Sequence, residues 1–239
     1  MSTGRPLAGT VLAAVTLALG LAACSPDLAG SPTAPSPGPL PSGGGAGPVV
    51  APPTSEGPGL TAPGIRLSAV PKGDGSFDVT EEVMLRDATS TLHLRLPQTG
   101  ERLVGMMTKT KPVASSLQVT ADDELVAVDD PKVTQARDLQ LVEPATKLIL
   151  TYRLSGSTVR SIPSEAGRAS SALSPLTAGT DGTLPTNIVV SGDGLLNVVC
   201  PQLTETRCAV GEPPGMGVQQ GLPADRALAV LQLNLPMQP

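Results

Sequence analysis

The sequence predicts an all-β fold for most of the chain, an antiparallel sandwich of the immunoglobulin-like or a similar type. Three observations support this prediction. Apolar and polar residues alternate at a period of two, the alternating runs are short, and Gly, Pro and Asp separate them. Aromatic residues make up 1% of the chain, so the core must be built from Leu, Val, Ile, Ala and Met. Residues 64–239 are long enough for a single domain with such a core.

The predicted strands follow one another along this domain. Residues 77–86 alternate cleanly, and Lys72-Gly73-Asp74-Gly75 supplies the turn before them. Further strands are expected within 92–96, 117–128, 148–154, 188–200 and 231–235. Of these, 117–128 and 188–200 are expected to be hairpins, the second turning at 192–194. A short helix over 164–173 is the one helical candidate, with Ser164 as its cap.

The first 23 residues have the features of a signal peptide. Arg5 supplies a positive charge, and Leu7 to Leu21 form an apolar stretch. As a helix this stretch would span about 22 Å, which is short for a bilayer core of ~30 Å. It is therefore expected to be removed and not to serve as a permanent anchor.

The end of this segment, Leu21-Ala22-Ala23-Cys24, resembles the lipobox of bacterial lipoproteins. The resemblance implies cleavage before Cys24 and thioether attachment of diacylglycerol to it. In some organisms an amide-linked third chain such as palmitate follows. The alternative is an ordinary secretory signal followed by a chance cysteine. A lipidated Cys24 would hold the protein on the extracytoplasmic face of the cell membrane.

Residues 24–63 are predicted to be a lipidated cysteine followed by a disordered linker. Pro, Gly and Ser dominate residues 25–63, and Asp27 and Glu56 are the only charges. Prolines at this density exclude helices and interior strands. The linker is interpreted as a spacer that lifts an extracytoplasmic domain away from the membrane, the alternative being low-complexity sequence without a role.

Two cysteines remain once Cys24 is assigned to lipid. Cys200 and Cys208 form an even pair in an oxidising compartment, so a disulfide between them is expected. Two free thiols and a metal-binding pair are the alternatives. The hypothesis of a metal-binding pair has little support, because the chain has one histidine. No metal and no cofactor is therefore predicted.

Candidate catalytic groups are few. His93 alternates with Leu92 and Leu94 and is expected on the exposed face of a strand. No G-x-S-x-G or S-x-x-K pattern occurs that would pair it with a nucleophile. The chain is therefore expected not to be an enzyme.

Two sets of carboxylates remain open. The acidic residues at 122–124 and 129–130 are interpreted as a solvated hairpin tip, with calcium ligation as the alternative. Glu81 falls on the apolar face of its strand. This position indicates a bulge, a place at the sheet edge, or a partially buried carboxylate with a partner such as Arg95 or Arg153, and structural pairing is favoured over catalysis.

Charge narrows the possible partners. Residues 64–239 hold 15 Lys plus Arg against 19 Asp plus Glu, which argues against nucleic acid. The favoured function is a non-enzymatic binding or scaffold module that contacts an envelope protein or a wall component. The alternative is a carrier of a lipid or other apolar ligand in a β-lined cavity, which would require an apolar void of more than ~300 Å³.

Overall fold

The computed structural model describes residues 55–98, 110–161 and 167–235. Its elements are β1 Gly64–Pro71, β2 Phe77–Leu94, β3 Val113–Ala121, β4 Glu124–Val126, β5 Arg137–Ser155, β6 Thr158–Arg160, β7 Arg168–Leu173, β8 Pro185–Val190, β9 Leu195–Val199, β10 Ala209–Val210, β11 Gly217–Val218, β12 Leu222–Pro223, a 3₁₀ helix η1 Ala224–Arg226 and β13 Ala229–Asn234. The predicted signal peptide and most of the predicted linker lie outside the described residues.

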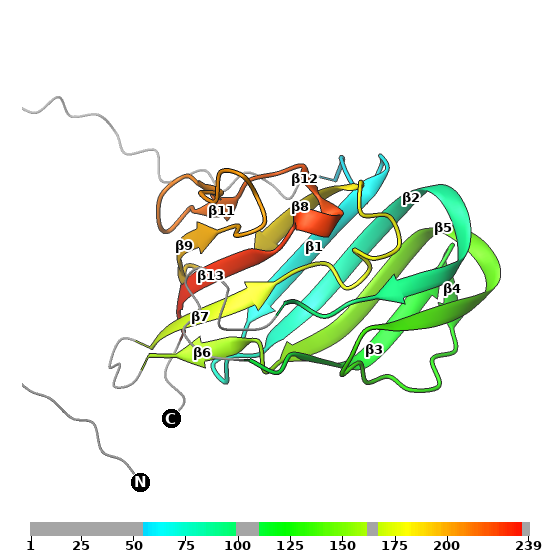
Figure 1. Cartoon of the computed structure of the whole chain (residues 1–239), viewed down its shortest axis with the longest axis horizontal. Helices are drawn as coiled ribbons and strands as arrows, with labels where there is room; N and C mark the ends of the chain where they lie inside the picture. Colours follow the sequence, from blue (N-terminus) through cyan, green and yellow to red (C-terminus); the bar gives the residue numbers. More distant parts are fainter. Residues whose placement is uncertain (1–54, 99–109, 162–166, 236–239) are drawn as a thin grey trace, which may run out of the picture. The chain divides into compact units, whose positions relative to one another are not determined.

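The strands form a β-sandwich, which confirms the predicted fold class (Figure 1). One sheet has seven strands in the order β12-β8-β1-β2-β5-β3-β4, and the other has four in the order β6-β7-β13-β9. Strands β10 and β11 pair separately. In the described part of the chain every strand pair is antiparallel except β1 with β8.

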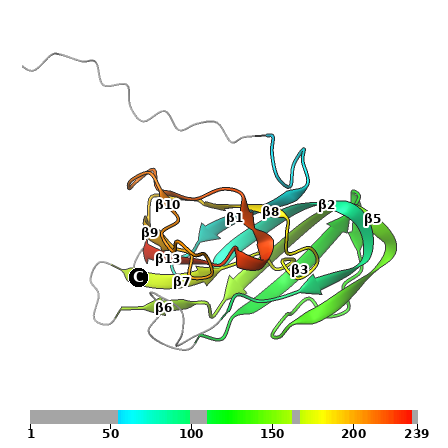
Figure 2. The same ribbon diagram turned by 45° about the horizontal axis from the view of Figure 1, so that its top comes forward.

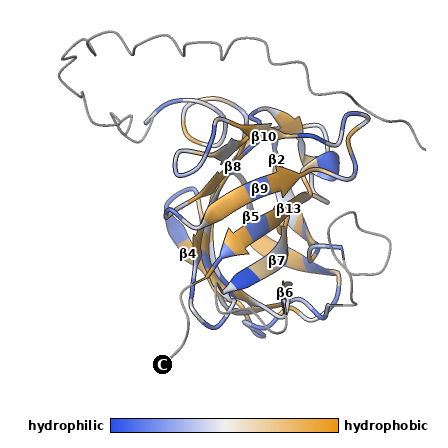
Figure 3. Ribbon diagram, turned by 90° about the vertical axis from the view of Figure 1, so that its left-hand side faces the viewer, coloured by the Kyte–Doolittle hydropathy of each residue, from blue (hydrophilic) through white to orange (hydrophobic). Residues whose placement is uncertain are grey.

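The core joins the two sheets. One cluster of buried side chains combines residues of the large sheet, such as Leu67 and Leu150, with residues of the small sheet, such as Leu173 and Leu231. Figure 3 shows β9, β13, β7 and β6 side by side as one layer in front of the large sheet. The period-two pattern therefore places aliphatic side chains between the layers, as the composition predicts.

Strand β2 is one long strand where the sequence predicted two. Its pairing with β5 shifts register between Met84 and Thr89, and again between Thr89 and Thr91. Both strands curl at the right-hand end of Figure 1, and Figure 2 shows the same curl after a turn. Unequal residue numbers between paired positions bend strands in this way. The bend lets β2 continue to Leu94.

The predicted hairpin over 188–200 is wrong. Strand β8 pairs with β1 and β12 in the large sheet, whereas β9 pairs with β13 in the small sheet. The chain crosses between the sheets at Gly194, whose carbonyl accepts a hydrogen bond from the Asn234 N–H at 2.7 Å. A Cβ at Gly194 would lie 2.6 Å from the Asn234 carbonyl oxygen. Glycine is required at this position because two segments of the backbone approach each other closely, and not because of a hairpin turn.

The predicted helix over 164–173 is also wrong where the structure describes it. Residues 168–173 form β7, which pairs with β13 along its whole length and with β6. Residues 162–166, including Ser164, lie outside the described residues. Sheet pairing on both sides overrides a weak helical propensity, because it satisfies the backbone and buries Ala169 and Leu173.

The described chain begins at Ser55, before the predicted domain start at Gly64. Residues 57–62 form a closed turn, in which the N–H groups of residues 60–62 all donate to the Gly57 carbonyl. The turn rests on the sheet at Gly59, where a Cβ would lie 2.4 Å from the Glu82 carbonyl oxygen. The last residues of the predicted linker thus contact β2.

Candidate functional site

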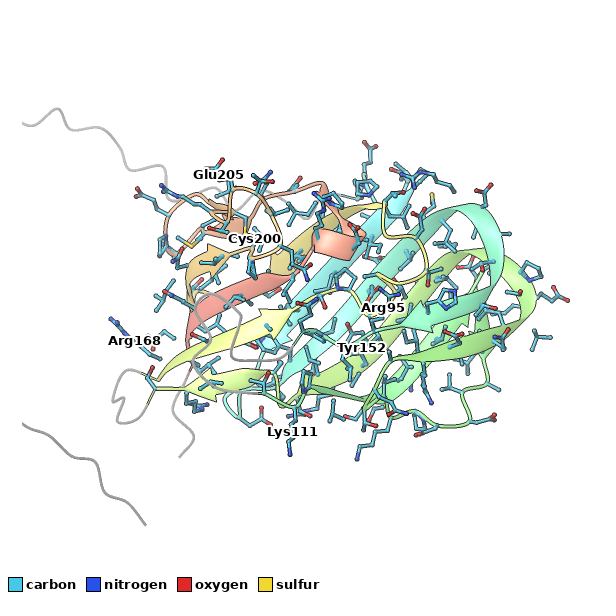
Figure 4. All side chains as sticks on the ribbon, in the orientation of Figure 1. Arg95, Lys111, Tyr152, Arg168, Cys200 and Glu205 are labelled. Carbon is cyan, nitrogen blue, oxygen red and sulfur yellow. A yellow bond between two sulfur atoms is a disulfide. The ribbon has the colours of Figure 1, made fainter. Side chains whose placement is uncertain are left out.

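Glu81 is a fully buried carboxylate in the large sheet, on β2 between β1 and β5. Its Oε2 accepts hydrogen bonds from the Leu176 N–H at 2.7 Å and from the Tyr152 hydroxyl at 3.4 Å. Its Oε1 accepts the Thr177 N–H at 3.0 Å and the Thr177 hydroxyl. Tyr152 lies near the centre of the sandwich in Figure 4. Glu81 therefore holds a loop against the inner face of the sheet.

The two arginines suggested as partners of Glu81 do not contact it. Arg153 follows Tyr152 on β5 and so points to the opposite face of the sheet, where its Nη2 lies 2.7 Å from Asp74 Oδ2. Of the alternatives for Glu81, a carboxylate with a partner is correct, but the side chain is fully and not partially buried, and its partner is not an arginine. Its partners are neutral donors, because the loop delivers backbone N–H groups to it.

Burial sets the protonation of this cluster. Desolvation raises the pKa of the Glu81 carboxyl, although four hydrogen bonds oppose the shift. Desolvation and the nearby Glu81 carboxyl raise the pKa of Tyr152 well above its usual range. At the protein surface the opposite holds for Asp74, where hydrogen bonds from the Ser76 hydroxyl and N–H, assisted by Arg153, lower the pKa to about 2.

The loop over residues 174–184 has further anchors on β2 and just beyond it. The Arg95 N–H donates to the Leu176 carbonyl at 2.7 Å. The His93 N–H donates to the Thr180 hydroxyl at 3.0 Å. Arg86 Nη1 lies 2.7 Å from Asp181 Oδ2. These contacts show that Glu81 is one of several attachment points and has a structural role.

His93 lies on the exposed face of its strand, as predicted. Its Nδ1 is 2.7 Å from Asp138 Oδ1, across the pair that β2 makes with β5. Among the described residues no serine, threonine or cysteine side chain is hydrogen-bonded to the imidazole. The pair lies at the surface and links β2 to β5.

Of the acidic residues predicted to form a hairpin tip, those at 122–124 lie there, whereas those at 129–130 follow β4 in the loop that leads to β5. Asp122 and Asp123 are the two turn residues between β3 and β4, and both have positive φ, 45° and 69°, which is the type I′ pattern. Asp122 accepts the Lys147 N–H at 2.9 Å, and Asp123 lies 2.9 Å from Lys147 Nζ. In the ranges the structure describes, no group of three His, Cys, Asp or Glu side chains could hold a metal ion.

Cys200 and Cys208 form the predicted disulfide, with Cα atoms 5.8 Å apart. Both side chains are buried. Figure 4 shows Cys200 near β9 and well separated from Tyr152. The bond closes the loop between β9 and β10, so its role is to hold that loop in place.

The double variant C200S/C208S should lower the free energy of unfolding by about 2–3 kcal/mol. Without the disulfide, the unfolded chain gains conformational entropy worth about that much for a loop of this length. Denaturant unfolding of the wild type with and without reductant is the measurement. The reduced wild type should match the variant. Equal stability of oxidised wild type and variant would contradict the assignment.

A groove lies at the free end of the large sheet. It has a volume of about 430 Å³ and lies where the β3–β4 hairpin meets the bend of β5. We call it the β4 groove, and its lining residues are Ala121, Asp122, Glu124, Leu125, Val126, Ala127, Leu141, Val142, Glu143, Pro144 and Ala145. Leu125 is 77% exposed and Val142 is 96% exposed, the highest values among the large apolar residues that the structure describes.

The β4 groove was not predicted. The sequence indicated a β3–β4 hairpin, but it gave no sign that Val142 would sit on the outside of a bend. Exposed apolar residues that gather beside polar ones are typical of interaction sites, whereas single exposed ones are common. Two such residues on one groove make it the leading candidate site.

A second groove of about 620 Å³ opens at the surface near the end of β2. Its lining is mainly apolar, with Arg95 and Lys111 as its cations, both labelled in Figure 4. The lining residues are Arg95, Leu96, Pro97, Lys111, Pro112, Val113, Thr134, Gln135 and Ala136. The chain segments on both sides of it lead to residues 99–109, which the structure does not describe.

The predicted lipidation site, Cys24, lies outside the described residues. Within them, no helix is long and apolar enough to cross a membrane.

Comparisons with known proteins give no family for this chain. No family model matches it, and no curated protein matches it. Among solved structures it is similar to the M1 zinc metallopeptidase from Deinococcus radiodurans, with a TM-score of 0.26 and 20% identity over 72% of this chain and 37% of that one. A mutant of that enzyme bound to a Tyr-Ser-Ala substrate gives the same TM-score and identity over 71% and 37%. The chain thus spans little more than a third of these structures, and the TM-score is too low to transfer any residue role.

Proposed function

We propose that the protein is an extracytoplasmic lipoprotein, tethered to the cell membrane through Cys24, whose domain is a non-enzymatic binding module of the cell envelope. The observation that carries the binding role is the β4 groove, with Leu125 and Val142 exposed beside carboxylates. Keeping both side chains in water forgoes the stabilisation that burial would bring, about 1.5–3 kcal/mol each. A partner that covers them recovers that free energy on binding.

The polar groups of the domain agree with this proposal. Glu81 attaches a loop, His93 pairs with Asp138, and the cysteines form a disulfide. Each group has a structural use, and none of them lines the β4 groove. The titrating groups that do line this groove are the carboxylates Asp122, Glu124 and Glu143.

A carrier of a lipid or other apolar ligand is the second candidate. The volume of the groove beside Arg95 and Lys111 falls within the range of about 300–1,000 Å³ typical of ligand sites, and its two cations suit an anionic headgroup. It lies at the surface, whereas the carrier hypothesis requires an apolar void inside the domain. Mass spectrometry of an organic extract of the purified protein distinguishes the two candidates, because a carrier releases a non-covalent lipid.

The double variant L125S/V142S should abolish the function of the protein in cells, scored as failure to complement a deletion of its gene. Both side chains are exposed, so unfolding free energy should change by no more than about 0.5 kcal/mol. V210S is the matched control, since Val210 is 56% exposed on β10 and away from the β4 groove. It should complement fully.

H93A tests the non-enzymatic part of the proposal in the same assay, and it should also complement. If H93A alone abolished the function, with normal stability and surface level, the binding proposal would be wrong and a hydrolase built around His93 would replace it. Complementation by L125S/V142S would equally refute the role of the β4 groove.

A further inference from the structure

The backbone beside the β4 groove offers free hydrogen-bonding groups. Strand β4 is the last strand of the large sheet, paired only with β3. A two-residue turn makes Ala121 and Glu124 the hydrogen-bonded pair of this hairpin. The N–H and C=O of the next residue, Leu125, therefore face away from β3. An extended segment could add to the sheet at this edge.

Charge at the β4 groove selects what can bind. Asp122, Glu124 and Glu143 line it, and no Lys, Arg or His does. Asp122 accepts backbone and side-chain donors of Thr146 and Lys147. Within the described ranges Glu124 and Glu143 make no ion pair. Covering them without a cation would leave carboxylates desolvated and unpaired, which is costly.

We propose that the β4 groove binds an extended segment of another protein, in which apolar side chains alternate with Lys or Arg, and that this segment adds to the edge of β4. Its backbone pairs with the free groups of Leu125. Its apolar side chains cover Leu125 and Val142, and its cations meet Glu124 and Glu143. This inference rests on the proposed binding function and specifies the partner for the same groove.

Other occupants fit less well. A second copy of the chain would bring Glu124 and Glu143 against the same acidic residues, and like charges on an edge strand prevent such pairing. The chain's own residues 25–54 contain no Lys or Arg and many prolines, which cannot donate to a strand edge. A segment rich in cations and apolar residues can pair with the carboxylates of the β4 groove and cover its exposed apolar side chains.

The test uses the full-length lipidated protein in detergent and two synthetic peptides, Lys-Val-Lys-Val-Lys-Val-Lys and its counterpart with Glu in place of Lys. The wild type should bind the Lys-Val peptide at least about tenfold more tightly than the Glu-Val peptide, since ion pairs of this kind are worth a factor of that order. E124K/E143K should reverse the preference. A Lys-Val peptide with alternate backbone amides methylated should lose at least about tenfold in affinity, because it cannot pair with the edge.

The variants separate this inference from the proposed function. Equal binding of both peptides, no binding of the Lys-Val peptide, or unchanged binding of the methylated peptide overturns the inference. If L125S/V142S then still fails to complement, the binding function stands with a different partner.

If the wild type instead forms a dimer that L125S/V142S disrupts, a second copy is the occupant and the inference is wrong. With E124K/E143K, a preference that does not change shows that the carboxylates do not select the partner.

Discussion

E81A should lower the free energy of unfolding by about 3–5 kcal/mol, because it removes a buried acceptor on which four donors depend. The N–H groups of Leu176 and Thr177 and the hydroxyls of Thr177 and Tyr152 all donate to this carboxyl. Each donor left buried without a partner costs about 1–3 kcal/mol, partly recovered where it finds another acceptor. Thermal and denaturant unfolding monitored by circular dichroism measure the loss.

E82Q is the matched control. Glu82 is the next residue of β2, points to the other face, and lies 3.9 Å from the Arg66 guanidinium with part of its side chain exposed. A pair of this kind contributes little, so the change should be within about 0.5 kcal/mol. Equal losses for E81A and E82Q would show that the Glu81 contacts do not hold the loop over 174–184.

E81Q addresses the charge of Glu81, and it remains measurable if E81A does not fold. In this variant the amide NH₂ group faces a backbone N–H, so two donors meet without an acceptor. The substitution should therefore lower the free energy of unfolding by about 1–3 kcal/mol. Burial raises the pKa of Glu81 in the folded state, so the folded protein favours the protonated carboxyl. The resulting contribution to the free energy of unfolding is fully present below the pKa of an exposed glutamate, about 4.3. It is lost as pH rises through the folded-state pKa.

The difference in unfolding free energy between wild type and E81Q should therefore be largest near pH 4 and should narrow toward pH 8. Comparing the two proteins at each pH cancels surface carboxyls such as Asp74, whose lowered pKa acts in the opposite direction. A difference that widens as pH rises would mean that Glu81 is stabilised in its charged form.

C24A should abolish lipid attachment completely and leave an uncleaved precursor, because the proposed processing attaches the diacylglycerol to the sulfur of Cys24. Mass spectrometry of the mature N-terminus is the decisive measurement. The wild type should begin at Cys24 with its acyl chains, and the variant at its original N-terminus. Labelling cells with a palmitate analogue gives the same contrast on a gel.

C200S/C208S is the control for this experiment. It removes the other two cysteines of the chain and should keep the label, so loss of label in C24A is specific to that site. A wild-type mature terminus elsewhere, or a free Cys24, would refute the lipoprotein proposal and leave an ordinary secreted domain.

Several features of the large sheet can be predicted from local sequence patterns. The alternation over 77–86 correctly predicts which side chains of β2 face the core, because the strand period of two depends on backbone geometry alone. The β1–β2 turn at 72–75 and the β3–β4 turn at 122–123 are also evident, since Gly and Asp tolerate the backbone angles that turns require. The disulfide follows from counting thiols.

Local patterns in the sequence are enough to predict which side chains point inward and where several of the turns lie. They are not enough to predict which strand pairs with which, because backbone hydrogen bonds are the same for every residue. Hence 188–200 looked like a hairpin although it joins two sheets. One donor to Glu81, the Leu176 N–H, lies 95 residues away in the sequence, and the exposure of Val142 depends on a bend set by the register of two long strands. These features become visible only in the folded chain, because each results from contacts between segments that are distant in sequence.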